Sequence, residues 1–259
     1  MSVNVNDIYN KFMSLKETEA IALGGSRASG NDDPKSDYDI YVYLTGMIDT
    51  SVREDILKPY CSVMEIGNHY FETEDNVVFT DGVCADIIYR RIDDLEKHVE
   101  FVWEKCNASN GYTTCFIHNV RTCEIIADKT GNLTKLQEKC RGDYPKDLKK
   151  AIIERNMNLL SGTLPSYDKQ IQKAYDRHDY VSINHRVTGF LESYFDVIFA
   201  LNEMTHPGEK KLMGICKKQC RILPDKFESN IVGLFEYMFK YDVSDILESM
   251  VEELRRIIE

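Results

Sequence analysis

Several features of other protein classes are missing from this chain of 259 residues. No apolar run approaches the roughly 18 residues of a membrane span, and the first residues lack the basic start and apolar stretch of a signal peptide. No Cys-x-x-Cys pair occurs among the eight cysteines, which favours reduced cysteines in the core over metal ligands. We therefore expect a soluble cytoplasmic protein without membrane association.

A basic excess is missing as well. The chain carries 32 Lys and Arg against 43 Asp and Glu, a formal net charge of −11. A general nucleic-acid binder needs a basic face for phosphate backbones, so this balance disfavours nucleic acid as a partner. An acidic chain is compatible with a cationic small molecule as a ligand.

Hydrophobic residues make up 43% of the chain, which supports packed cores and argues against disorder. The first half mixes short apolar or alternating stretches with helical patterns. Residues 113–128 are ambiguous. The predicted strands are 20–23, 37–44, 76–80 and 83–89, the last two forming a hairpin about Asp81-Gly82, and the predicted helices are 51–60, 92–105 and 132–140.

The second half has a different character, because no convincing strand occurs after Pro145. We place a domain boundary near 142–146, which divides the chain into 1–143 and 144–259. No flexible Gly/Ser linker separates these halves, so we expect them to pack firmly. The predicted helices are 146–162, 166–178, 180–203, 208–219, 224–240 and 243–258.

A glycine turn follows the first predicted strand and opens into a helix. It reads Gly24-Gly25-Ser26-Arg27. Consecutive backbone N–H groups in such a turn form a concavity that binds anions. The Ser26 hydroxyl is able to donate to a phosphate oxygen, and Arg27 supplies positive charge. The turn is neither a P-loop nor a dinucleotide-binding fingerprint.

Two aspartates stand two residues apart shortly after this turn. Because side chains at i and i+2 of a strand share a face, Asp37 and Asp39 present their carboxylates side by side. Two anions this close repel unless a cation lies between them. Mg²⁺ prefers hard oxygen ligands and commonly takes one or two carboxylates together with substrate phosphates. The pair therefore indicates a magnesium site beside the glycine turn.

A third acid, Asp86, lies in the apolar stretch 83–88. A carboxylate in such a strand is rare unless it is paired or bound to metal. If this strand neighbours 37–44, Asp86 joins Asp37 and Asp39, and three carboxylates hold two Mg²⁺ ions about 3.5–4 Å apart. Asp86 would act as a metal ligand, as the base for an acceptor hydroxyl, or as both.

These residues resemble the signature of the DNA-polymerase-β-like nucleotidyltransferase superfamily. The matching segments are Leu23-Gly24-Gly25-Ser26, Ser36-Asp37-Tyr38-Asp39-Ile40 and Asp86. The layout is similar to antibiotic nucleotidyltransferases of the aminoglycoside and lincosamide type, which carry a helical C-terminal domain. The resemblance implies a small mixed-sheet core, ATP or another NTP, Mg²⁺, and transfer of a nucleoside monophosphate with release of pyrophosphate. Gly25 and Ser26 would contact the triphosphate, and Asp37 and Asp39 would bind metal.

The helical half is similar to an uncharacterised domain that follows such nucleotidyltransferase domains, on the stretch 201–212. Lys210 and Lys211 in this stretch are candidates for triphosphate contacts. His206 is expected to be a loop or capping residue. His185, in an apolar helical pattern, is expected in the core.

The function expected from these motifs is nucleotidyl transfer to a hydroxyl of a small molecule, such as a cationic antibiotic-like compound, at a site between the two halves. Glu192, Asp196 and Glu203 are candidates for attracting such a ligand. Two alternatives stay open: an acceptor that is a tRNA end or a protein side chain, and a non-catalytic nucleotide-binding module. Both a monomer and a homodimer are compatible with the sequence.

Overall fold

A computed structural model describes residues 3–28 and 36–259 of the chain. Within these residues it shows a mixed α/β protein with a six-stranded mixed sheet, which confirms the predicted fold class. No helix of the described residues is both long enough and apolar enough to span a membrane.

The chain divides into two compact units. The first comprises Met1–Glu100 and Asn119–Gly142, and the second comprises Phe101–His118 and Asp143–Glu259. The segment 101–118 therefore groups with the helical half of the chain. The division into domains at 143/144 stays a prediction.

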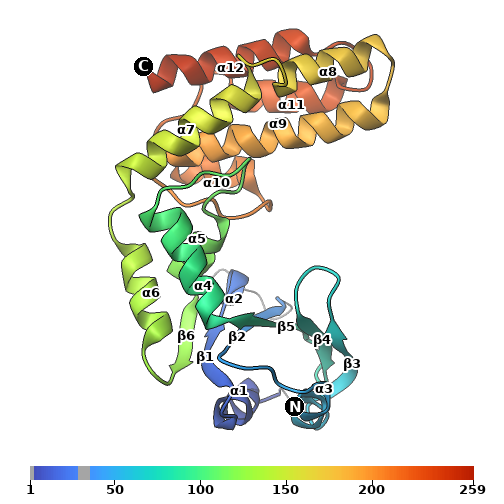
Figure 1. The fold of residues 1–259 in the computed structure, drawn as a ribbon. Helices are drawn as coiled ribbons and strands as arrows, with labels where there is room; N and C mark the ends of the chain where they lie inside the picture. Colours follow the sequence, from blue (N-terminus) through green and yellow to red (C-terminus); the bar gives the residue numbers. More distant parts are fainter. Residues whose placement is uncertain (1–2, 29–35) are drawn as a thin grey trace. The chain divides into compact units, whose positions relative to one another are not determined.

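The first 142 residues contain all the strands among the described residues, together with short helices (Figure 1). The elements are α1 (Val5–Ser14), β1 (Thr18–Leu23), α2 (Gly25–Ala28), β2 (Tyr38–Leu44), α3 (Thr50–Leu57), β3 (Cys61–Asn68), β4 (Glu74–Phe79), β5 (Cys84–Arg91), α4 (Ile92–Val99), the π-helical turn η1 (Glu100–Glu104), α5 (Cys115–Thr122), β6 (Glu124–Asp128) and α6 (Asn132–Arg141).

The strands form one sheet in the order β3-β4-β5-β2-β1-β6. Only β2 and β5 of the described pairs run parallel, and the other neighbours are antiparallel. The predicted hairpin is confirmed as β4 and β5, and its turn residue Gly82 has φ +89°. The interior strand β2 therefore has β1 on one side and β5 on the other.

Helices α1 and α3 cover one face of this sheet (Figure 1). Their apolar side chains pack with Ile40 and Val42 of β2 and with Ile87 of β5, which are all buried. Because side chains alternate along a strand, Asp39 and Asp86 point to the other face. The apolar layer thus fixes which face carries the carboxylates.

A buried ion pair lies within the packed face. Arg53 of α3 donates from Nη1 to Oδ1 of Asp75 at 2.8 Å, and both side chains are buried. The backbone N–H of Gly67 donates to the same oxygen at 2.7 Å, and the Tyr89 hydroxyl donates to Oδ2 at 2.7 Å. Burial raises the pKa of Asp75, and these hydrogen bonds oppose the rise. Asp75 is thus a structural acid that joins α3 to the sheet.

Six helices follow in the remainder of the chain, as the sequence predicts (Figure 1). They are α7 (Lys146–Leu160), α8 (Tyr167–Asp176), α9 (Tyr180–Leu201), α10 (Leu212–Gln219), α11 (Phe227–Tyr237) and α12 (Ser244–Ile258).

The structure corrects four details of the sequence-based assignment. Strand β3 was not predicted, and the predicted helix 92–105 ends at Val99 and continues as the π-helical turn. The ambiguous segment 113–128 is the helix α5 followed by the strand β6. His185 is exposed on α9 instead of lying in the core, because it falls on the polar side of a helix whose first half is amphipathic.

Helix α9 is the centre of the second unit, and its C-terminal half is almost wholly buried. Tyr194 lies there in an aromatic cluster, with ring centroids 6.3 Å from Phe190 and 6.4 Å from Phe227. Aromatic pairs at these separations add stabilisation beyond their buried area. The cluster ties α9 to α11.

A buried polar network fastens the segment 109–113 to the same helix. The Thr113 hydroxyl donates to Oδ2 of Asp196 at 2.7 Å, and the Thr113 N–H donates to Oδ1 at 3.2 Å. Asn156 of α7 donates to Oδ2 at 3.2 Å and accepts the N–H of Gly111 at 3.0 Å. This network explains why a segment 83 residues away in sequence belongs to the helical unit.

Replacing Arg53 by Met is expected to destabilise the first unit by about 3–5 kcal/mol, because Asp75 is left buried without its cation. Hydrogen exchange of the β4 and β5 amides measures the loss in this unit alone. The control Arg91→Met removes an exposed pair with Asp93 and should cost less than about 1 kcal/mol. Equal effects of the two substitutions would contradict a stabilising role for the buried pair.

The stability of the second unit should depend on pH through the protonation of Asp196. Burial raises the pKa of this carboxyl to about 6, while hydrogen bonds from Thr113 and then Asn156 oppose the rise. The folded state therefore keeps a proton that the unfolded state releases, so lowering the pH from 7 towards 4 should stabilise the wild type relative to Asp196→Asn.

The difference in unfolding free energy between wild type and Asp196→Asn should grow by at most about 1.4 kcal/mol for each pH unit. Urea unfolding followed by the fluorescence of Trp103, the one tryptophan, which is buried in this unit, measures it. The exposed control Asp245→Asn on α12 should show a much smaller dependence. A constant difference between wild type and Asp196→Asn from pH 7 to 4 would refute the raised pKa.

Candidate functional site

The glycine turn lies directly against the carboxylate of Asp39. Gly25 has φ +65°, and a Cβ built there would lie 1.9 Å from Oδ2 of Asp39. The N–H of Gly24 donates to the backbone carbonyl of Asp39 at 2.8 Å. A side chain at position 25 would be strained by the backbone and would also displace the carboxylate. The turn and Asp39 therefore form one local structure.

Asp39 and Asp86 are direct neighbours across the parallel strands. They are register partners in the β2–β5 pair, so their backbones are about 4.8 Å apart. Both side chains are half-buried and lie on the face opposite α1 and α3. The sequence left open whether these two strands are neighbours. Their pairing thus brings the two carboxylates together.

Asn76 lies beside Asp86 and extends the row formed by Asp39 and Asp86 across the sheet. The sequence alone did not indicate this residue. Asn76 is the register partner of Asp86 in the β4–β5 hairpin and donates to Oδ1 of Asp86 at 2.9 Å. The side-chain amide of Asn68 of β3 donates to the side-chain Oδ1 of Asn76 at 2.6 Å. A two-residue turn at Asp81-Gly82 would pair residue 77 with residue 86. The turn instead closes between Phe79 and Val83, which pairs Asn76 with Asp86, so the hairpin signal did not identify Asn76.

A further acid lies near the row. Burial raises the pKa of Glu74, and the charge of Asp86 adds to the rise. Within the described residues, Oδ2 of Asp86 accepts no hydrogen bond. The acids on this face of the sheet therefore present negative charge, and Oδ2 of Asp86 keeps its lone pairs available, which favours a cation.

The other predicted residues of the first unit have more varied environments. Asp37 precedes β2 and is exposed. Arg27 donates from Nε to the backbone oxygens of Ser36 at 2.9 Å and Asp37 at 3.2 Å, and its guanidinium lies 3.9 Å from the ring centroid of Tyr38. Arg27 thus joins α2 to the start of β2. The side chain of Ser26 falls outside the described part of the structure.

The predicted residues Lys210 and Lys211 are exposed and belong to the second unit, and their contact with triphosphate stays a prediction. His206 is a loop residue, as expected, but it is fully buried. Its ring lies 4.6 Å from that of Tyr112 and 4.9 Å from that of Phe199. Burial lowers the pKa of His206 to about 3, so this histidine is neutral at ordinary pH.

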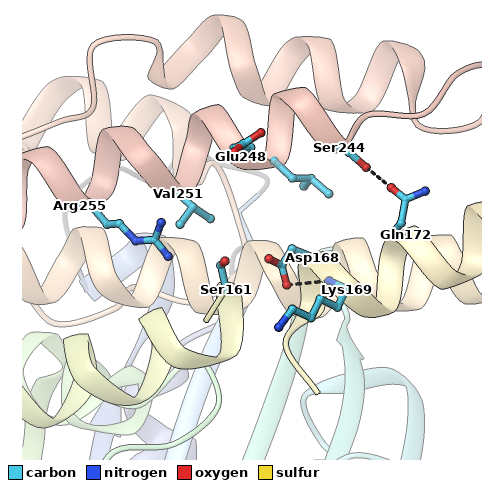
Figure 2. A pocket seen from close by; sticks show the side chains of 9 residues that line it. Ser161, Asp168, Lys169, Gln172, Ser244, Glu248, Val251 and Arg255 are labelled. Carbon is cyan, nitrogen blue, oxygen red and sulfur yellow. Dashed lines mark hydrogen bonds between the residues drawn. The ribbon is translucent and has the colours of Figure 1, made fainter. Parts of the chain in front are cut away.

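A small cavity of about 270 Å³ lies in the helical unit between α8 and α12 (Figure 2). The hydroxyl of Ser244 donates to Gln172 at its edge. None of the predicted site residues lines it. Its charged side chains have both signs and are Asp168, Lys169, Glu248 and Arg255.

The oxygen donors of the first unit suit a hard divalent cation. Carboxylates of Asp39 and Asp86 are the ligand type that Mg²⁺ selects. Among the described residues, no three His, Cys, Asp or Glu side chains gather as a metal site on their own. Coordination by Asp37, Asp39 and Asp86 therefore stays a prediction, in which substrate oxygens and water complete the shell.

Comparison with protein families finds one match, which spans the end of the first unit and the start of the helical half. Residues 112–212 match a family described as a domain of unknown function, DUF4037. This match includes the stretch 201–212 on which the resemblance to an uncharacterised domain depends. A comparison with curated proteins finds no match for the chain.

Solved structures similar to the chain are named as nucleotidyltransferases or as proteins like them. A nucleotidyltransferase-like protein from Exiguobacterium sibiricum is 12% identical, with 98% of this chain and 73% of that chain covered, at a TM-score of 0.46. An aminoglycoside 6-adenyltransferase from Bacillus subtilis is 10% identical, with 98% and 88% covered, at 0.34. A spectinomycin adenyltransferase from Enterococcus faecialis, solved with ATP and spectinomycin, is 12% identical, with 97% and 100% covered, at 0.32.

Proposed function

We propose that the protein transfers a nucleoside monophosphate from ATP or another NTP to a hydroxyl group of a small molecule. One observation carries this proposal. Asp39 and Asp86 are register partners on parallel strands, and the glycine turn lies against the carboxylate of Asp39. This places a carboxylate pair next to a turn of the kind that binds phosphate.

The acidic row would hold Mg²⁺ through Asp39 and Asp86, with Asp37 as a further ligand. When bound, the metal supplies charge neutralisation of the phosphates and stabilises the attacking and leaving oxygens, and two ions suit this role. The donor set supports the assignment because it consists of hard carboxylate oxygens. Asn76 holds one oxygen of Asp86 by its 2.9 Å hydrogen bond and so orients the other.

The triphosphate would lie on the turn formed by Gly24, Gly25 and Ser26. Backbone N–H groups of such a turn bind phosphate oxygens without any side chain, which is why glycine suits these positions. Further positive charge would come from Arg27, Lys210 and Lys211. The turn would grip the β- and γ-phosphates and leave the α-phosphorus beside the carboxylates.

In the reaction, the acceptor oxygen forms a bond to the α-phosphorus while the bond from this phosphorus to the bridging oxygen breaks. Pyrophosphate leaves with that oxygen. The hydroxyl proton passes to a carboxylate, and Asp86 suits this role because its Oδ2 accepts no hydrogen bond from described residues. We infer that Asp86 acts as the base and Asn76 as its positioning residue.

The acidic net charge of −11 supports a small-molecule acceptor, and a cationic one in particular, over a nucleic acid. A cytoplasmic location and a monomeric or homodimeric state complete the proposal. Incubation with α-labelled ATP and pooled hydroxyl compounds would identify the acceptor as a labelled product that forms together with pyrophosphate.

Loss of either paired carboxylate should abolish nucleotide binding with metal. We expect Mg²⁺ with α,β-methylene-ATP to stabilise the wild type by about 2.7 kcal/mol at one hundred times the Kd. Asp39→Asn and Asp86→Asn should lose most of this stabilisation, because the metal loses a ligand. Thermal unfolding with and without the metal nucleotide measures it.

The control for this experiment is Asp94→Asn, which removes an exposed carboxylate paired with Lys97 at 3.2 Å. This variant should respond to the metal nucleotide as the wild type does. A wild type that no metal nucleotide stabilises would refute the proposal. An unchanged response in Asp39→Asn would refute the assigned metal ligand.

A pair of glycine substitutions separates backbone strain from damage to the site. Gly25 and Gly82 both have positive φ, but a Cβ at Gly82 meets nothing within 4 Å. Gly25→Ala and Gly82→Ala should each cost about 1–2 kcal/mol of stability in hydrogen exchange. Only Gly25→Ala should also lose the response to the metal nucleotide, because its methyl group displaces Asp39. Retention of the full response in Gly25→Ala would contradict the role of this contact.

A further inference from the structure

A large cavity of about 650 Å³ lies wholly within the second unit. It is bounded by α9, by the start of α10 and by α11, with Tyr112 of the segment 101–118 at one side. The volume falls within the range of small-molecule sites. None of the carboxylates proposed to bind metal lines it.

The walls of this cavity are mainly apolar. Aliphatic, aromatic and thioether groups form most of the lining, which suits an apolar ligand of variable shape. The principal apolar residues are Val187, Leu191, Phe195, Leu212, Ile231 and Met238.

Three charged side chains line the same cavity, and they sum to one negative charge. They are Glu192 of α9, and Glu209 and Lys211 before α10. Glu192 is half-buried, and among the described residues it has no hydrogen-bond or ion-pair partner. Burial raises the pKa of Glu192, because no partner group in the described part of the chain stabilises the charged carboxylate. A carboxylate in this position is stabilised by a ligand cation.

The backbone around these acids is tightly constrained. A Cβ at Gly111 would lie 2.7 Å from the Cβ of Glu192, so the segment before Tyr112 is pressed against α9. Tyr112 and Lys211, at two edges of the cavity, have φ +51° and +59°. Non-glycine residues in this conformation are strained, and such strain gathers at ligand-binding positions. Strained backbone thus lies at two edges of the cavity.

From this geometry we propose that the cavity binds a largely apolar molecule that carries a single ammonium group, with the cation at Glu192. The apolar walls match the body of such a ligand, and the net charge of the lining matches one positive charge. The same features disfavour a polycation, whose further charges would lie against apolar groups without partners. The ammonium site uses no carboxylate of the first unit, and Lys211 is the one lining residue that is also proposed to contact the triphosphate.

Matched aromatic probes test the proposal by calorimetry on the full chain without nucleotide or metal. 4-Phenylbenzylamine should bind about tenfold more tightly than 4-phenylbenzyl alcohol, and 4-phenylbenzoate should bind most weakly. In Glu192→Gln the preference for the amine over the alcohol should fall to about twofold, with the alcohol unchanged. Spermine should bind more weakly than the monoamine.

Two further variants keep the test decisive. Leu191 of α9 lines the cavity and is only partly buried, so the larger side chain of Leu191→Trp should reduce the cavity and weaken the amine and the alcohol alike. Glu248→Gln, in the smaller cavity beside α12, should leave every affinity unchanged. Absence of saturable amine binding, equal affinity for the three aromatic probes, or tighter binding of spermine would overturn the proposal. Because no nucleotide is present, these outcomes do not depend on the proposed nucleotidyl transfer.

Discussion

Residue 39 faces residue 86 because β2 and β5 pair in parallel with this register, and the chemistry proposed for the first unit depends on that pairing. A shift of one residue would turn one carboxylate towards the apolar layer under α1 and α3. The two carboxylates repel one another on neighbouring strands, so the packed apolar face must hold them together. A divalent cation would relieve this repulsion, so the metal binding proposed for Asp39 and Asp86 would stabilise the first unit.

Buried acids in this protein show that burial alone does not indicate a reactive site. Asp75 is more deeply buried than Asp86, but Arg53, Tyr89 and a backbone N–H satisfy its oxygens. Asp86 is only half-buried and receives one amide hydrogen bond on one oxygen. A carboxylate with all its acceptors filled serves the fold, whereas one with a free oxygen beside a second acid is suited to chemistry.

Local patterns in the sequence were enough to predict β1, β2, the β4–β5 hairpin and the six C-terminal helices, because periodicity and turn residues are local signals. They did not reveal β3, a partly exposed edge strand whose alternation is weak. They also left open whether β5 adjoins β2, since a parallel partner is set by the whole sheet. At the candidate site the motif residues were visible, but Asn76 and the contact of Gly25 with Asp39 required the register and the backbone angles.

Glu192 and Asp196 lie one helical turn apart on α9, and the segment 101–118 contacts both. With Asp196 it stabilises the fold, and beside Glu192 it forms part of the cavity. Thr113 supplies donors to Asp196, which is thereby satisfied in the interior. Two residues earlier, Gly111 is pressed against Glu192, and Tyr112 lines the cavity that this second acid faces. Both effects come from residues that precede the predicted boundary at 143/144. A helical fragment that began at residue 144 would keep the Asn156 donor to Asp196 but would lose both Thr113 donors. It would also lose Tyr112 from the cavity, so the helical unit needs the segment 101–118 to be complete.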